Sequence, residues 1–136
     1  MLFGDKGLAY HVDFSNGSRD YPVEEWTPEL AAIKHTVDTV CAIQYYPHGE
    51  VGINAHRDKE MKSETKICGL SLGVTRTLSI MRGSKQYQLP LYHGSLYVFN
   101  PPTNDYWAHE IPVESEVTLP RLSLTFRNYE IFHPFG

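Results

Sequence analysis

The sequence predicts a mainly β protein, a double-stranded β-helix (jelly roll) with one supporting helix near the N-terminus. Short apolar stretches separated by glycine, proline and asparagine recur through the middle of the chain, whereas a helical pattern occurs once. Many short strands with few helices are typical of two β-sheets packed face to face. The chain has 136 residues and no internal repeat, so we expect one domain over residues 1–136.

The first part of the chain predicts a β-hairpin followed by the helix. Residues 8–14 have an extended pattern, residues 15–18 are a strong turn signal, and the second strand runs to Tyr21. Thr27 is the expected helix N-cap, with Pro28 at the first helical position. Apolar residues at helical spacing then extend the helix to about residue 37.

The rest of the chain predicts short strands. They are expected at residues 40–46, 67–73, 76–81, 86–91 and 95–99, with a hairpin turn at 82–85. Residues 120–127 alternate polar and apolar side chains with a period of two. This alternation places Arg121, Ser123, Thr125 and Arg127 on one face of the segment.

Three side chains are candidate metal ligands. His56 and Asp58 are two residues apart, and in an extended segment such residues point to the same side. His109 is the candidate for a third ligand, because two histidines and one carboxylate form the facial triad of non-haem Fe(II) oxygenases. Three protein ligands leave three octahedral positions open, which can take a bidentate 2-oxo acid and dioxygen.

An H-x-D pair alone is a weak signal in a chain with seven histidines and 16 acidic residues, and the C-terminal segment adds to it. Arg121 and Arg127 share a face with small polar side chains, and two arginines in such a place need an anion. A dicarboxylic acid bound to the metal would supply one, with a guanidinium donating two hydrogen bonds to the far carboxylate.

Taken together, these residues resemble the AlkB family of Fe(II)/2-oxoglutarate dioxygenases, and most closely its eukaryotic-type DNA-repair members. The matching stretches are residues 3–8, 44–60, 70–76, 91–96 and 100–127, which cover most of the chain. The joint spacing of the three candidate ligands with the two arginines is the specific part of the resemblance.

The resemblance implies roles for individual residues. Fe(II) would be held by His56, Asp58 and His109, with 2-oxoglutarate and dioxygen as cosubstrates. The 2-oxoglutarate site would consist of Gln44, Tyr46, Arg121, Ser123 and Arg127, with Arg121 at the far carboxylate and Arg127 near the other. The family usually carries asparagine at the position of Gln44, so the contact of this longer amide is open.

The resemblance also implies a nucleic-acid substrate, because repair members of the family flip a damaged base into the pocket. Its candidate pocket residues are Phe3, Tyr10, Glu60 and Trp107, although Phe3 and Tyr10 are equally explained as core residues. The family normally has a longer N-terminal portion that completes a recognition lid. We therefore expect a reduced lid or a fragment, and a preference for single-stranded substrates.

Composition sets limits on partners and location. The net charge of -4 and the pI near 5.9 argue against a large non-specific grip on nucleic acid, which needs clustered Lys and Arg. The basic residues between Arg57 and Lys66 alternate with acidic ones, which is typical of a solvated loop as much as of a phosphate-contacting rim. No apolar run approaches the ~18 residues of a membrane span, and the start of the sequence lacks the apolar core of a signal peptide. We therefore expect an intracellular protein that does not enter membranes, and we expect a monomer. Cys41 and Cys68 are expected to be reduced, buried thiols.

Three functional hypotheses remain. The first is a nucleobase oxygenase that demethylates or hydroxylates alkylated bases in DNA or RNA. The second keeps the Fe(II)/2-oxoglutarate chemistry but places it on a protein side chain or a small molecule. The third is a non-catalytic jelly-roll binding module, and it requires the spacing of ligands and arginines to be accidental.

Overall fold

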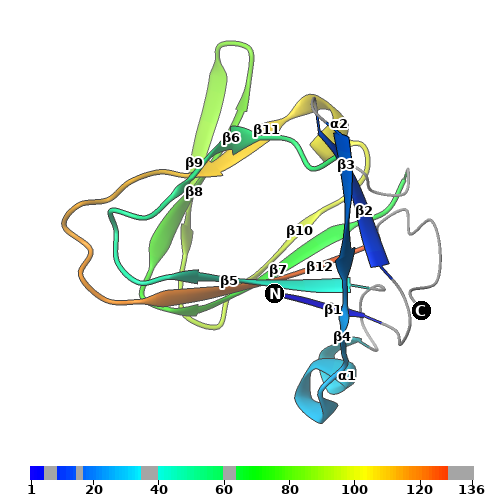
Figure 1. The fold of residues 1–136 in the computed structure, drawn as a ribbon. Helices are drawn as coiled ribbons and strands as arrows, with labels where there is room; N and C mark the ends of the chain where they lie inside the picture. The colour runs from blue at the N-terminus through cyan, green and yellow to red at the C-terminus, as the bar shows by residue number, and fades with distance from the viewer. Residues whose placement is uncertain (5–8, 15–16, 35–39, 60–63, 129–136) are drawn as a thin grey trace.

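The computed structural model describes residues 1–4, 9–14, 17–34, 40–59 and 64–128, and its main feature is a pair of β-sheets (Figure 1). The larger sheet has the strand order β10 (Leu96–Phe99), β7 (Ile67–Gly73), β12 (Arg121–Arg127), β5 (Val40–Tyr46), β1 (Leu2–Gly4) and β4 (Glu24–Glu25). The smaller sheet has the order β6 (Ile53–His56), β11 (Ala108–Ile111), β8 (Arg76–Arg82) and β9 (Lys85–Leu91). The predicted jelly-roll class is thereby confirmed.

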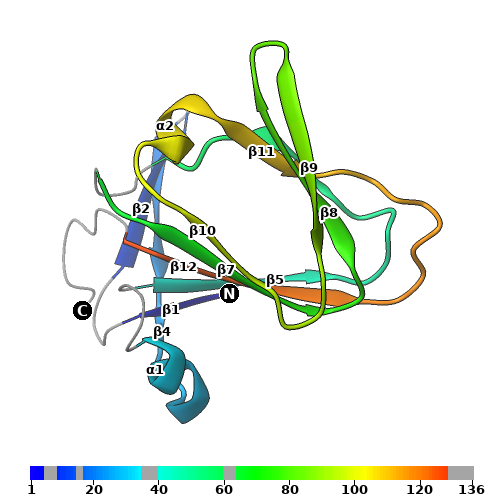
Figure 2. The same ribbon diagram turned by 180° about the vertical axis from the view of Figure 1, so that it is seen from behind.

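A two-stranded sheet, β2 (Ala9–Phe14) with β3 (Gly17–Pro22), confirms the predicted N-terminal hairpin. Views from both sides place this hairpin at one end of the molecule, opposite the long connections between β5 and β6 and between β11 and β12 (Figures 1 and 2). Among the described residues, no helix is long and apolar enough to cross a bilayer.

The predicted helix N-terminus is confirmed in α1 (Pro28–Lys34). The backbone N–H of Leu30 donates to Thr27 Oγ1 at 3.3 Å, which is the bond expected of an N-cap threonine. The predicted continuation to residue 37 falls outside the described residues. A second short helix, α2 (Thr103–Tyr106), was not predicted, because four residues are too few to show a helical period.

Apolar side chains fill two separate clusters, one on each face of the larger sheet. The cluster between the sheets contains residues of both: Tyr46, Ile67, Leu78, Leu91, Phe99 and Ile111. The other cluster lies on the outer face near α1 and contains Phe3, Leu30, Cys41, Cys68, Leu124 and Phe126. Both cysteines are buried free thiols, as expected. Burial of such side chains supplies most of the energy that holds the sheets together.

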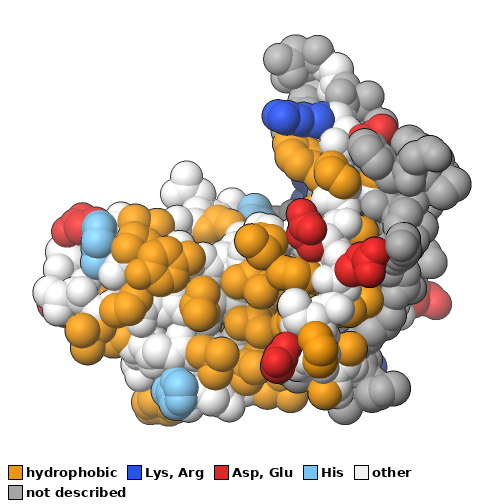
Figure 3. All heavy atoms as spheres, turned by 60° about the horizontal axis from the view of Figure 1, so that its bottom comes forward, with side chains coloured by type: hydrophobic (Ala, Val, Ile, Leu, Met, Phe, Trp, Pro, Cys, Tyr) orange, Lys and Arg blue, Asp and Glu red, His pale blue; other side chains and the backbone are white. Residues whose placement is uncertain are grey.

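Part of the outer face of the larger sheet stays exposed, and it is apolar (Figure 3). The exposed side chains include Tyr45, Leu96, Val98 and Leu122. The strand register places them on the same face, because Leu122 pairs with Tyr45 and with Leu72. The opposite face of the same strands therefore carries the polar residues of the predicted site.

Arg76 is a buried arginine at the end of the molecule that lies opposite the β2–β3 hairpin, and only 1% of its surface is exposed. Its guanidinium donates to four backbone carbonyls, those of His48, Gly49, Val51 and Pro112, at 2.9 to 3.4 Å. It also pairs with Glu114 at 3.3 Å. These bonds join the connection that precedes β6 to the one that follows β11, and therefore fix where both strands lie.

We expect Arg76→Ala to lower the free energy of unfolding by about 3–5 kcal/mol, because it removes the cation of a buried pair and takes the guanidinium donor away from the carbonyls of Val51 and Pro112. Urea denaturation measures the change. Arg19→Ala is the control, since Arg19 is exposed and lies over the ring of Tyr21 at 5.2 Å, so that its loss should cost about 1 kcal/mol or less. Equal losses in the two variants would contradict the role given to Arg76.

Candidate metal and cosubstrate site

The three predicted ligands converge at one place in the smaller sheet. β6 and β11 run antiparallel, and their register sets His56 directly opposite His109, with ring centroids 4.4 Å apart. Asp58 follows β6, and one candidate ligand atom from each of the three residues lies within 4.8 Å of the others. A separation of 53 positions along the sequence is closed by a single strand pairing.

The imidazole rings are oriented by specific contacts. His56 Nδ1 lies 2.8 Å from the carbonyl oxygen of Asn54, so Nδ1 carries the proton and donates it, and Nε2 is left as the ligand atom. That Nε2 atom lies 3.4 Å from Asp58 Oδ1. On the other side, Nε2 of His109 lies 4.0 Å from Asp58 Oδ2. Both Nε2 atoms therefore face one carboxylate.

The charges at the cluster suit metal binding. Burial lowers the pKa of His109 to about 4, so its ring is neutral at pH 7. Burial raises the pKa of Asp58, but the hydrogen bond with His56 and the charge of Arg127 outweigh it, and the net pKa lies below the ordinary value. The hydrogen bond with Asp58 raises the pKa of His56. A metal ion would take the place of the proton that His56 and Asp58 share.

The predicted cosubstrate residues face the smaller sheet from β5 and β12. Their register pairs Arg121 with Tyr46 and Ser123 with Gln44. The Arg121 guanidinium lies 5.2 Å from the centre of the Tyr46 ring, and its Nε donates to Ser71 Oγ at 2.8 Å. Its Nη1 is buried and donates to no acceptor among the described residues. Such an unused buried cationic donor fits an anion.

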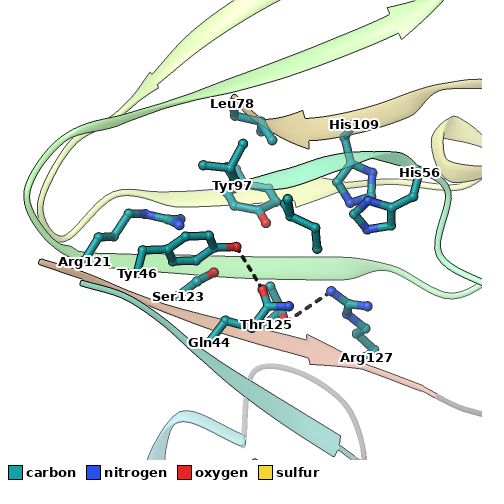
Figure 4. Close-up of a pocket in the computed structure, with 12 residues that line it drawn as sticks. Gln44, Tyr46, His56, Leu78, Tyr97, His109, Arg121, Ser123, Thr125 and Arg127 are labelled. Atoms are coloured by element: carbon teal, nitrogen blue, oxygen red, sulfur yellow. Dashed lines mark hydrogen bonds between the residues drawn. The ribbon is translucent and has the colours of Figure 1, made fainter. Parts of the chain in front are cut away.

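A pocket joins the metal cluster to this arginine. In Figure 4, His56 and His109 lie at one end, Arg121 and Tyr46 lie at the other, and Arg127 lies below the histidines. The pocket is lined by Gln44, Tyr46, Ile53, His56, Leu78, Tyr97, His109, Ile111, Arg121, Ser123, Thr125 and Arg127. All five predicted cosubstrate residues are among them.

Several lining residues were missed by sequence reasoning. Thr125 could have been included, because it shares the alternating face of β12 with its two arginines; its Oγ1 accepts from Arg127 Nη2 at 3.2 Å. Tyr97, Leu78, Ile53 and Ile111 could not, since an apolar strand pattern marks a buried residue without showing which side of it faces a ligand.

Asn104 is the most informative of the missed residues. Its amide makes two hydrogen bonds with the backbone of Asp58: Nδ2 donates to the carbonyl at 2.8 Å, and Oδ1 accepts from the N–H at 2.9 Å. Beside it, Arg57 Nη1 donates to the carbonyl of Asp105 at 2.6 Å. These bonds tie α2 to the segment after β6, and so hold the carboxylate ligand against the strand that carries His109.

Arg127 lies closer to the metal cluster than to Arg121. Its Nη1 pairs with Asp58 Oδ1 at 2.9 Å. The other carboxylate oxygen, Oδ2, is buried and accepts no hydrogen bond from the described residues. Two imidazole nitrogens and this oxygen are the donor set that non-haem Fe(II) takes. The residues present therefore fit the implied metal.

The predicted substrate-pocket residues are more scattered. Phe3 packs into the outer cluster beside α1 and does not line the pocket, which favours its core interpretation. Tyr10 is paired with Tyr21 in the hairpin, and its side chain, like the whole of Glu60, lies outside the described residues. Trp107 is half-buried and contacts the ring of Tyr87, with centroids 5.7 Å apart.

Comparison with known proteins agrees with this geometry. The family profile described as "2OG-Fe(II) oxygenase superfamily" matches residues 23–127. The human protein named "DNA oxidative demethylase ALKBH2" is 35% identical, over 92% of this chain and 54% of its own length. The mouse protein named "Alpha-ketoglutarate-dependent dioxygenase alkB homolog 3" is 29% identical, over 78% of this chain and 44% of its own. The chain thus spans about half the length of the curated relatives it matches.

A solved structure shares the fold. "The structure of OsALKBH1" superposes on this chain with a TM-score of 0.59 and 19% sequence identity, covering 80% of this chain and 53% of the other. The matched profile covers more than half of the chain and includes all three candidate ligands and both arginines. The chain therefore belongs to the 2OG-Fe(II) oxygenase superfamily, as an AlkB-like member of a family whose cofactors are Fe(II), 2-oxoglutarate and dioxygen.

Proposed function

We propose that residues 1–136 form one oxygenase domain that oxidises alkyl groups on nucleobases in single-stranded DNA or RNA, with oxidative demethylation as its main outcome. The observation that carries the proposal is the convergence of His56, Asp58 and His109 at one end of a pocket whose other end holds an unused guanidinium donor. The printed name of the human relative, a DNA oxidative demethylase, supports the choice of reaction.

The proposed roles follow from the contacts. Two neutral imidazoles and one carboxylate hold a divalent metal and leave room beside it for a bidentate cosubstrate and dioxygen. When bound, Fe(II) with 2-oxoglutarate and dioxygen supplies an oxidant for C–H bonds, and 2-oxoglutarate leaves as succinate and carbon dioxide. A hydroxylated N-methyl group then breaks its C–N bond and leaves as formaldehyde.

The two arginines have separate roles in this proposal. Arg121, fixed by Ser71 and packed over Tyr46, binds the far carboxylate of 2-oxoglutarate and so sets its direction in the pocket. Arg127 pairs with Asp58, which keeps that ligand charged, and its position beside the cluster suits the carboxylate nearer the metal. Gln44 Oε1 accepts from the Tyr46 hydroxyl at 3.2 Å, so it orients the tyrosine.

The acidic net charge of -4 favours a second candidate, in which the same chemistry acts on a protein side chain or a small molecule. A nucleic-acid enzyme with this charge has to rely on local contacts, and it should favour bases that are already unstacked, since extracting them costs least. A non-catalytic binding module is the weakest candidate, because it gives no use to the convergence of His56, Asp58 and His109 on one point.

We expect His109→Ala to weaken Mn²⁺ binding to the metal-free protein by more than about 100-fold, because loss of a ligand should exceed the 10–100-fold effect typical of residues that only orient ligands. Calorimetric titration measures the affinity. His48→Ala is the control, since His48 is an exposed histidine outside the cluster. Equal affinities for parent and His109→Ala would refute the ligand assignment.

Arg121→Ala should raise the KM for 2-oxoglutarate roughly 10- to 100-fold, because a charge-assisted hydrogen bond to the far carboxylate contributes about 1.5–3 kcal/mol. Arg121→Lys should recover only part of the loss, since an ammonium cannot reproduce the two-pronged contact. The rate of succinate formation at varied 2-oxoglutarate concentration gives the KM of the parent and of each variant. Thermal unfolding checks that each variant is folded. A KM within twofold of the parent in Arg121→Ala would sink this role.

Matched single- and double-stranded oligonucleotides with one N-methylated base test the substrate. We expect faster formaldehyde release from the single strand, and an affinity that falls with salt by roughly one log unit per log unit of salt for each phosphate contact, with few contacts in total. Faster turnover of the duplex would contradict the single-strand preference. Succinate formation without turnover of either oligonucleotide would favour the protein or small-molecule candidate.

A further inference from the structure

Exposed aromatic and cationic side chains lie on the same face of the smaller sheet as the two candidate histidine ligands. The register pairs Tyr87 with Ile80, Ile80 with His109, and His109 with His56. Directly paired residues of neighbouring antiparallel strands project to the same face. Tyr87 therefore belongs to the row of side chains that ends at the metal cluster.

The next row along the strands continues the same face. Arg82 pairs with Lys85, and Ala108 pairs with Met81, so Trp107 comes beside Arg82. Trp107 has an extended backbone and lies two residues before His109, which points both to the same side. The Tyr87 and Trp107 rings contact each other at 5.7 Å, tilted by 47°.

Apart from the half-buried Trp107, the side chains of this region are too exposed to serve the core. Tyr87 and Tyr106 are 55% and 56% exposed, and β9 is the last strand of its sheet. The Arg82 guanidinium lies over the Tyr106 ring at 4.9 Å, and Lys85 is exposed beside it. Figure 1 shows the β8–β9 hairpin extending beyond β6 and β11. We name Arg82, Lys85, Tyr87, Tyr106 and Trp107 the aromatic strip.

We propose that the aromatic strip binds the nucleotides that flank the base at the metal, with a single-stranded polynucleotide as its occupant. This inference rests on the proposed function. Aromatic rings stack on any base, and Arg82 and Lys85 supply positive charge for the phosphates on a chain that is acidic overall. Tyr87 lies two strands from His109, about 10 Å at ~4.8 Å per strand, which is the length of about three stacked nucleotides.

The aromatic strip gives the nucleotides outside the pocket a place to bind. The pocket runs between the metal cluster and Arg121, and its lining includes none of the residues of the aromatic strip. The aromatic strip starts beside that pocket and leads away from it. It therefore gives a sequence-independent grip that acts on neighbouring bases, and it should matter for oligonucleotides more than for single nucleotides.

The test compares a methylated mononucleotide with a five-nucleotide single strand that carries the same base. In Tyr87→Ala, the ratio of kcat/KM on the pentanucleotide to kcat/KM on the mononucleotide should fall roughly tenfold, a typical effect of removing one stacking ring. Tyr87→Phe keeps the ring and should restore the ratio. Tyr92→Ala is the matched control, because Tyr92 is 62% exposed and lies just beyond the end of β9.

Two binding measurements report on the strip without turnover. A single strand should quench tryptophan fluorescence in the parent, and Trp107→Phe, which leaves only Trp26, should lose that quenching. Arg82→Gln should lower the slope of log affinity against log salt by about one.

Failure of this inference can be told apart from failure of the proposed function. Suppose that the parent demethylates oligonucleotides, but that Tyr87→Ala changes the ratio of kcat/KM on the pentanucleotide to kcat/KM on the mononucleotide by less than twofold. The aromatic strip is then not a binding site, while the proposed function stands. If the parent forms succinate but neither binds nor turns over any oligonucleotide, both fail. Quenching of Trp107 by a peptide and not by a single strand would also overturn the proposal.

Discussion

The antiparallel pairing of β6 with β11 is the constraint on which the site depends. It sets His56 opposite His109, and the other polar contacts of this region serve to keep that pairing in place. Arg76 holds the connections at one end of the two strands, while Asn104 ties Asp58 to α2 at the other end. A short ladder with few hydrogen bonds of its own is thus fixed from both ends, which is what ligand geometry requires.

The charged side chains of the pocket lie at its two ends. At one end, a buried carboxylate pairs with Arg127 and lies between two imidazoles; at the other, Arg121 keeps an unused donor. Each buried charge costs desolvation energy that only a partner offsets. Among the described residues, the Nη1 atom of Arg121 has no acceptor, which favours the binding of an anionic ligand there. On the smaller sheet, the face that carries the two histidines leads, through the row of Tyr87, to the aromatic strip.

Much of the fold could be predicted, because the pattern of the longer strands is visible in the sequence. The alternation in residues 120–127 showed which side chains of β12 share a face, and the limits of β5 and β7 were predicted correctly. By contrast, β6, β11 and α2 have four residues each, too few to show a period, and unlike the four-residue β10 they have no continuous apolar run that marks them. The role of Asn104 and the row of Tyr87 follow only from strand register, which local patterns do not determine.

We propose that one metal ion is held by two imidazoles and one carboxylate. X-ray absorption spectroscopy of the anaerobic Fe(II)-loaded protein tests it most directly, because imidazole rings give multiple-scattering features that carboxylates and water lack. We expect a six-coordinate iron with two imidazole ligands and oxygen donors at the remaining positions. A spectrum without imidazole scattering, or with sulfur from a cysteine at the iron, would contradict it.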